Sequence, residues 1–437
     1  MQLKRIKGKM SLAACSLLQV ASPAVHAADS NWDIDTAFLY YSESDGRVQA
    51  AEPAIYAGRN LGDDNRIDIR FVADVLTGAT PNGAHATGTV QTFTTPSGGG
   101  SYTANPGETP LDSTFHDTRG ALGADWTLSL DRLSRLILGA NVSSEFDYIS
   151  AGISSTYARD LNNRNTTLTA GISFNSDTIN PVGQVPIEFA PMRGLGLATN
   201  RDGSSETKTL TDFIFGVTQI VNRKTIVQLN YTMGLTDGYQ NDPYKIITVL
   251  DPVTGLPATV TGSSFFDTAT TGNLPYVYEK RPSSRQRNAL FFKTVHHLTE
   301  DVINFSYRYF WDDWGINSHT LDLRYRYQLA GSYLQPHVRY YTQEAADFYQ
   351  HNLQLGTDVD AATGAVSADY ASSDYRLAKF VTTTVGLKYG LPLGHNSEIA
   401  LRGELINQAI DNSGIPAGEA TPDLNAMVLQ LNYSLVW

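Results

Sequence analysis

Met427-Val428-Leu429-Gln430-Leu431-Asn432-Tyr433-Ser434-Leu435-Val436-Trp437 is the last stretch of the chain. Large apolar or aromatic side chains occupy every second position from 427 to 437, and Gln430, Asn432 and Ser434 lie between them. Successive side chains of a β-strand point to opposite faces, so this period of two predicts a strand. One face of that strand is apolar, and most of the other is polar.

A strand of this kind that ends in an aromatic residue resembles the closing strand of a bacterial outer-membrane β-barrel. In such barrels the terminal aromatic residue is the usual insertion signal. The resemblance therefore implies that Trp437 is an insertion signal and that barrel-assembly machinery is the partner that binds this strand.

The other end of the sequence predicts export. Four basic residues between positions 4 and 9 precede a mostly apolar run over residues 12–25, and Val25-His26-Ala27 offers a small-residue cleavage site. Residues 1–27 are thus predicted to be a cleaved signal peptide, which leaves residues 28–437 as a single barrel domain. A lipoprotein cleavage box at Leu12-Ala13-Ala14-Cys15 is the alternative, but only two uncharged residues separate it from Lys9.

Charge and cysteine content exclude several classes of function. Cleavage after Ala27 would remove four of the 32 basic residues and none of the 44 acidic ones, which leaves a net charge of −16. Nucleic-acid binding needs a basic patch, so it is disfavoured. Cys15 is the only cysteine and lies in the predicted signal peptide, so the mature chain is expected to have no disulfide, redox pair or c-type haem.

Further segments alternate in the same way and place their charged residues on one face; examples are residues 32–42, 66–76, 302–312 and 319–329. In a membrane barrel one face of each strand meets lipid and the other meets the lumen. The charges are therefore expected to point inward. A weaker strand is expected near residues 48–58.

The connections between these strands alternate in length. Short turns are predicted at residues 61–65, 129–133, 160–163, 221–224, 298–301, 330–332 and 391–396. Longer polar loops are predicted at residues 77–115, 177–204, 235–285, 343–373 and 411–423. Short periplasmic turns and long extracellular loops are typical of the outer membrane. This scheme gives about 16 antiparallel strands in an all-β transmembrane barrel, with both termini on the periplasmic side and no transmembrane helix.

A secreted soluble β-sandwich also shows alternation and turns. The number of strands, the loop asymmetry and the position of the aromatic residues disfavour it. Aromatic residues gather at predicted strand ends, where rings prefer the boundary between hydrocarbon and water; they include Tyr40-Tyr41, Tyr307, Tyr309, Tyr340-Tyr341 and Tyr389.

Four segments resemble the motifs of a bacterial family known as domain of unknown function 3570. They are Asp74-Val75-Leu76-Thr77-Gly78-Ala79-Thr80-Pro81-Asn82-Gly83-Ala84, Tyr278-Glu279-Lys280-Arg281-Pro282, Asp312-Asp313-Trp314-Gly315-Ile316-Asn317-Ser318-His319-Thr320 and Ser373-Asp374-Tyr375-Arg376-Leu377-Ala378. The resemblance spans most of the mature chain. It implies an outer-membrane fold and supplies no catalytic residue.

One candidate site is the turn motif formed by Asp312, Asp313, Trp314, Gly315 and His319. Together with Asn317, its oxygen and nitrogen donors could converge on a cation such as Ca²⁺. The favoured interpretation is a hairpin whose Asp and Asn side chains satisfy the turn backbone, with Trp314 as an anchor at the membrane interface. No metal site and no cofactor are therefore predicted.

A second candidate is a basic cluster that follows a long loop, namely Lys280, Arg281, Arg285 and Arg287. Facing outward, it would bind lipopolysaccharide phosphates. Facing inward, it would join a lumen field that is either a selectivity constriction or a structural network. The residues proposed for that lumen field are Asp68, Arg70, Asp74, Arg308, Asp322, Arg324, Arg326, Arg339, Arg402 and Glu404.

The sequence gives little support for an enzymatic function. Eight histidines are scattered among the predicted strands and loops, without an HExxH or GxSxG motif: His85, His116, His296, His297, His319, His337, His351 and His395. A hydrolase with a spatially assembled Ser/His/Asp site is an alternative, because such sites need no sequence proximity.

The sequence thus predicts an outer-membrane barrel in contact with lipid and lipopolysaccharide, most simply a porin-like channel or export conduit for polar solutes. The main alternative is a non-conducting barrel that acts as a scaffold or receptor for a periplasmic or extracellular partner.

Overall fold

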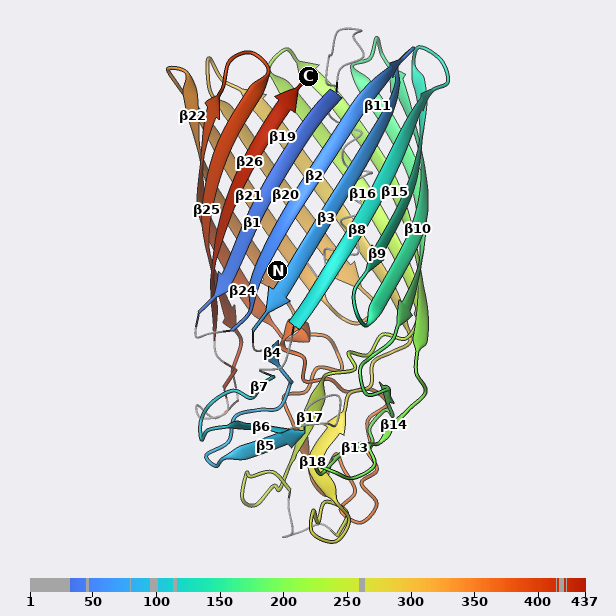
Figure 1. The fold of residues 1–437 in the computed structure, drawn as a ribbon, viewed down its shortest axis with the longest axis vertical. Helices are drawn as coiled ribbons and strands as arrows, with labels where there is room; N and C mark the ends of the chain where they lie inside the picture. The colour runs from blue at the N-terminus through green and yellow to red at the C-terminus, as the bar shows by residue number, and fades with distance from the viewer. Residues whose placement is uncertain are drawn as a thin grey trace.

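The protein is a closed barrel of 16 antiparallel strands with a folded cap at one end (Figure 1). The computed structural model describes residues 32–44, 47–78, 80–94, 101–112, 116–258, 264–413, 415, 420–421 and 423–437. The predicted signal peptide and its cleavage site lie outside these residues. The barrel strands are β1 (Trp32–Glu43), β2 (Gln49–Gly62), β3 (Asn65–Thr77), β8 (His116–Ser129), β9 (Ser134–Ser144), β10 (Tyr148–Leu161), β11 (Thr166–Ile179), β15 (Glu206–Asn222), β16 (Thr225–Gly238), β19 (Ser284–His297), β20 (Val302–Asp312), β21 (Asn317–Leu329), β22 (Ser332–Gln343), β24 (Phe380–Pro392), β25 (Ser397–Ile410) and β26 (Leu424–Val436).

The period-two pattern decides which side chains meet lipid. On β26, Met427, Leu429, Leu431 and Tyr433 are exposed on the outer face, as the sequence predicts. Exposed apolar residues coat the other barrel strands in the same way, for example Phe71 on β3. Because the sheet is closed, no strand edge is left unpaired, and the apolar coat surrounds it. A bilayer requires both features. The predicted fold class is confirmed.

One end of the barrel carries the short turns, the start of β1 at Trp32 and the end of the chain at Trp437, and we call it the turn end. Each of the seven predicted short turns joins two barrel strands there. The two-residue turn between β2 and β3 places Asp63 and Asp64 at φ 49° and 59°, a left-handed conformation that Asp tolerates in tight turns. Among the described residues, no helix is both long and apolar enough to cross a membrane.

The other end, which we call the loop end, carries the predicted long loops. They fold into small sheets below the barrel in Figure 1, and together these sheets and their loops form the cap. The cap elements are β4 (Thr80–Pro81), β5 (Gln91–Thr94), β6 (Ser101–Ala104), β7 (Leu111–Asp112), β12 (Val185–Pro186), β13 (Pro191–Arg193), β14 (Arg201–Asp202), β17 (Ile246–Leu250), β18 (Asn273–Tyr278), β23 (Leu353–Gln354) and the 3-10 helix η1 (Tyr375–Leu377).

The cap has its own hydrophobic core, which the sequence analysis did not predict. Strands from three different loops form one sheet in the order β13-β18-β17-β23. Ile247, Val249, Val277 and Leu353 of this sheet are fully buried against Phe266 and neighbouring residues. Burial of such side chains contributes about 1.5–3 kcal/mol each. The long loops are therefore a folded layer over the loop end.

The predicted aromatic positions divide between the two faces. Tyr340 and Tyr389 are exposed on the outside, in agreement with an interfacial role. Tyr41 and Tyr341 line a cavity inside the barrel, so their prediction as interface residues is wrong. The reason is the strand period, because neighbours such as Tyr340 and Tyr341 must point to opposite faces.

Candidate functional site

The predicted lumen residues lie on the inner faces of the barrel strands. On β3, Asp68 and Arg70 line an internal cavity, and buried Asp74 is paired with Arg119 at 2.7 Å. Arg324, Arg339, Arg402 and Glu404 line a second internal cavity. Asp322 contacts a residue of that cavity, and the alternation of β20 and β21 places Arg308 and Arg326 on the same inner face.

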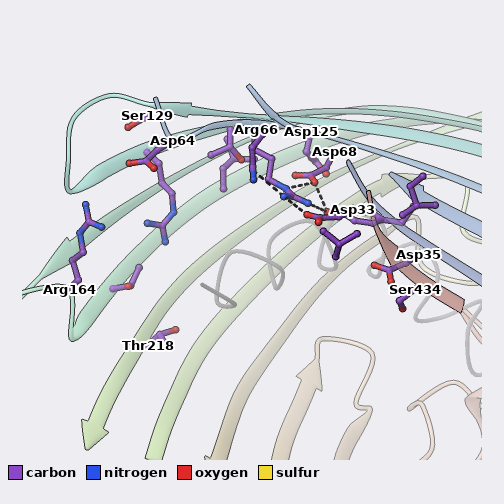
Figure 2. A pocket seen from close by; sticks show the side chains of 18 of the residues that line it. Asp33, Asp35, Asp64, Arg66, Asp68, Asp125, Ser129, Arg164, Thr218 and Ser434 are labelled. Carbon is purple, nitrogen blue, oxygen red and sulfur yellow. Dashed lines mark hydrogen bonds and ion pairs between the residues drawn. The ribbon is translucent and has the colours of Figure 1, made fainter. Parts of the chain in front are cut away.

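The first cavity, which we call the vestibule, occupies the lumen at the turn end (Figure 2). Its volume is about 1290 Å³, and its walls come from β1–β3, from β8–β11 and from strands across the barrel. Arg66 binds both Asp33 and Asp68 at 2.7 Å. Carboxylates outnumber cations in the lining, which includes Asp33, Asp35, Asp64, Asp68, Asp125, Asp131, Asp160 and Glu398 against Arg66, Arg70, Arg132, Arg135 and Arg164. The vestibule is therefore an acidic entrance.

The opposite wall is basic. Strands β19–β25 place nine cations on the inner face, namely Arg285, Arg287, Lys293, Arg308, Arg324, Arg326, Arg339, Lys388 and Arg402. Two carboxylates at the centre of this basic wall, Asp322 and Glu404, each lie 2.9 Å from a ring nitrogen of His337. They also pair with Arg324 at 3.2 Å and Arg402 at 3.7 Å. The lumen thus carries fixed charge of opposite sign on its two walls.

The bridging role of His337 was missed, because cross-strand register decides it. Arg324 lies opposite His337 on β22, and His337 lies opposite Gly386, which in turn faces Glu404. Both ring nitrogens of His337 contact carboxylates, so neither nitrogen is left to activate a serine. This arrangement holds charges in place rather than forming a hydrolytic centre.

The second cavity, which we call the basic pocket, lies between the basic wall, the neighbouring strands β26, β1 and β2, and η1. It has a volume of about 380 Å³ and is lined by residues of β1, β2, β21, β22, η1 and β24–β26. Tyr375 and Arg376 of η1 line this pocket. The cap therefore reaches into the lumen and narrows it at the loop end.

A buried ionic cluster fixes η1 in this position. Arg376 binds Asp242 at 2.5 Å and Asp374 at 2.9 Å, and Arg281 binds Asp374 at 2.9 Å and Glu279 at 2.7 Å. Asp374 also caps η1 by accepting the N–H of Arg376. These contacts join the loop that follows β16 to the loop that follows β22.

The pKa values of this cluster reflect its crowding. Burial alone would raise the pKa of Asp242, but Arg376 and Lys245 beside it lower that pKa to about 2. Burial likewise opposes ionisation of Asp374, yet Arg376 and Lys245 hold its pKa well below the usual range. Burial raises the pKa of Glu279, although Arg281 counteracts it. The two aspartates are therefore charged under ordinary conditions.

The predicted basic cluster does not form one surface. Arg281 lies in the buried ionic cluster, Arg285 binds Asp312 at 2.8 Å, and Arg287 lies 3.5 Å from Asp212. Lys280, at the surface of the cap, lies 3.7 Å from Glu188. Arg285 and Arg287 are on the inner face of β19, since Leu290 and Phe292 are exposed outside.

The turn motif is a satisfied hairpin, as the favoured interpretation predicts. Asp312 accepts the N–H groups of Trp314 and Ile316 at 3.1 and 2.9 Å, and Gly315 has φ 84°. His319 lies outside the barrel, stacked on Tyr307, so the motif does not converge on a cation. No group of three or more potential metal-binding side chains occurs in the part of the chain that the structure describes.

The predicted role of Trp314 as an interface anchor is wrong. Trp314 is buried in the cap with Phe348 and Leu377, and its indole N–H donates to the carbonyl of Ser284 at 2.9 Å. The guanidinium of Arg285 lies 4.3 Å from its ring. The loop that covers Trp314 comes from residues after β22, and the local sequence gives no sign of that contact.

The family model described as "Protein of unknown function (DUF3570)" matches residues 7–435. No curated protein matches the sequence. Among solved structures, outer membrane protein opdK of Pseudomonas aeruginosa is similar at 9% identity and a TM-score of 0.40, covering 94% of this chain and 99% of that one.

OccK5 (OpdH) of Pseudomonas aeruginosa is similar at 10% identity and a TM-score of 0.39, over 94% of this chain and 98% of that one. A structure described as "Bacterial polysaccharide outer membrane secretin" is similar at 8% identity and a TM-score of 0.41, over 93% of this chain and 99% of that one. Such distant likenesses decide nothing about cargo. The closed barrel, its apolar coat and its short turns are the form of bacterial outer-membrane proteins, which confirms the predicted localisation.

Proposed function

We propose that this chain, which belongs to the DUF3570 family of proteins of unknown function, is a porin-like channel for polar solutes. The observation that carries this proposal is the charged lumen inside an apolar coat. Cavities of about 1290 and 380 Å³ lie within the closed barrel, and ionised side chains line both. A structural barrel without cargo would gain more stability from an apolar interior.

The charged walls of the lumen can replace the hydration that a polar solute loses when it leaves water. A channel offers polar side chains in place of hydration, and binding must stay weak enough for release. Pairs such as Arg66 with Asp33 and His337 with Glu404 hold the charged groups in fixed positions. The transverse charge separation would orient a polar molecule across the lumen.

The cap gives this channel its selectivity. It is folded over the loop end, and η1 reaches the basic pocket. A solute that enters from the loop end must therefore pass between cap elements. Export of a solute from the vestibule would meet the same barrier from inside.

The proposal includes the processing and partners of the chain. Cleavage after Ala27 would release residues 28–437 as one barrel domain.

Barrel-assembly machinery would bind β26, with Trp437 as the insertion signal. Lipid contacts the outer coat, and lipopolysaccharide would contact the aromatic band near the loop end, which includes Tyr307, Tyr309 and Trp311. A periplasmic partner would meet the turn end. Channel function requires no catalytic residue and no cofactor.

The decisive experiment is single-channel recording of the refolded mature chain in a planar bilayer. Heat-modifiable gel migration shows beforehand that the barrel has folded. Discrete conductance steps with an ion preference are expected. A folded barrel that stays silent across voltages and salts would overturn the channel proposal and favour a scaffold or receptor.

A further inference from the structure

We propose that the basic pocket binds a small organic anion with an apolar body, and that the free guanidinium of Arg339 holds its acid group. This inference deepens the channel proposal and rests on it for its physiological meaning. The site itself consists of a cavity, a cation and a pair of aromatic rings. Its ability to bind a ligand does not depend on whether the barrel conducts ions.

Arg339 is the only basic-pocket arginine that lacks both a hydrogen bond and a salt bridge to any described residue. Arg324 is paired with Asp322, Arg376 with Asp374 and Asp242, and Arg402 with Glu404. Arg339 lines the cavity with no such partner. A guanidinium presents a planar fork that suits a carboxylate or phosphate.

The nearby carboxylate does not fill this role. Glu404 interacts electrostatically with Arg339, but its oxygen is bound by His337 at 2.9 Å and lies 3.7 Å from Arg402. Asp322, which lies opposite Arg339 in the β21–β22 register, is likewise taken by His337 and Arg324. An anion from solution would complete the charge balance of Arg339, and a charge-assisted bidentate contact is the strong form of such a bond.

The rest of the pocket suits an apolar body. Tyr341 and Phe380 line it with ring centroids 5.6 Å apart, and Leu39, Ile406 and Val428 extend the apolar surface. Its volume of about 380 Å³ lies within the range of small-molecule sites. An inorganic anion would leave this surface uncovered, and a neutral sugar would leave Arg339 unpaired. The combination favours an aromatic or branched aliphatic carboxylate.

Benzoate is a suitable probe of this site. Its binding to the folded, detergent-solubilised full barrel is measured by titration calorimetry for the wild type, Arg339→Gln and Arg223→Gln. Arg223 is the matched control, because it is an arginine in an exposed turn between β15 and β16 and does not line this pocket. Benzyl alcohol tests the charge requirement, and acetate tests the apolar body.

We expect Arg339→Gln to weaken benzoate binding at least about tenfold, the effect of losing one charge-assisted bond, while Arg223→Gln leaves it unchanged. Benzyl alcohol and acetate should bind more weakly than benzoate to the wild type. Equal benzoate affinity in all three proteins, or no benzoate binding to a folded wild-type barrel, would overturn the site.

Parallel bilayer recordings separate this outcome from the channel proposal. Conductance without benzoate binding would overturn the proposed site and support the channel. Benzoate binding by a folded barrel that does not conduct would support the site and overturn the channel proposal.

Discussion

Trp32 and Trp437 exchange two backbone hydrogen bonds of 2.8 Å, one in each direction. They extend the antiparallel pairing of β1 with β26, which runs from Asp33 opposite Val436 to Glu43 opposite Ala426. This pairing joins the first and last strands of the ring and so closes the barrel. The last residue of the chain is therefore part of the closure itself.

Deletion of Trp437 should lower the amount of barrel in the outer membrane severalfold, because the deletion removes both bonds to Trp32 and the terminal aromatic ring. Trp437→Phe keeps the backbone and an aromatic ring, so it should insert normally. Membrane fractionation with heat-modifiable gel migration measures both variants. Normal levels of the deletion variant would refute the role of Trp437 as an insertion signal.

Asp374→Asn should open the cap while leaving the barrel folded. Removing this carboxylate leaves Arg281 and Arg376 undercompensated in a buried site, and breaking such a network costs about 3–5 kcal/mol. Limited proteolysis of the cap should become faster, and channel currents should become larger and noisier. Asp251→Asn, in an exposed turn of the cap, is the control that should change neither. Wild-type protease resistance of Asp374→Asn would show that the ionic cluster does not hold the cap.

The cap should also loosen in mild acid through His85. Burial, assisted by the nearby His351, lowers the pKa of His85 from 6.5 to about 4. Between about pH 6.5 and 4, His85 is therefore protonated in the unfolded cap and neutral in the folded cap. The free energy of unfolding of the cap is highest above pH 6.5 and decreases as the pH falls. The largest loss is about 3 kcal/mol.

Hydrogen exchange of cap amides as a function of pH measures this effect. His85→Gln removes the titrating ring, so its cap should show a flatter profile over the same range. An unchanged pH profile in His85→Gln would assign the acid sensitivity to other groups. Asp242 is such a group, but its pKa of about 2 places its effect at much lower pH.

Arg324→Ala and Arg326→Ala should each shift ion selectivity toward cations. Arg324 lines the basic pocket and Arg326 lies on the same wall, so each substitution removes one positive charge from the lumen. The reversal potential under a KCl gradient reports the shift. Lys224→Ala, at an exposed turn outside the lumen, is the control. Unchanged reversal potentials in a conducting channel would remove these arginines from the selectivity region.

The barrel could be predicted from the sequence because its strands are defined by local alternation. The terminal strand, the count of 16 and the short turns agree with the structure. Even the weak strand predicted near residues 48–58 is present as β2. Lipid on one side and water on the other impose the same period on every strand, so each strand can be recognised from its own sequence alone.

The cap and the pocket could not be predicted in the same way. β17 and β23 are short strands that pair with each other from different loops, and Trp314 is buried by a loop that follows β22. The isolation of Arg339 depends on His337 taking both neighbouring carboxylates. Such features depend on register across several strands, which one sequence does not specify.

The parallel pairing of Val249 with Leu353, between β17 and β23, fixes an order of biogenesis. The two strands belong to loops separated by four barrel strands, β19 to β22, so they can meet only after those strands lie side by side. The contact between β17 and β23 therefore forms only when β19 to β22 are already paired, which makes the cap sheet a late element of assembly.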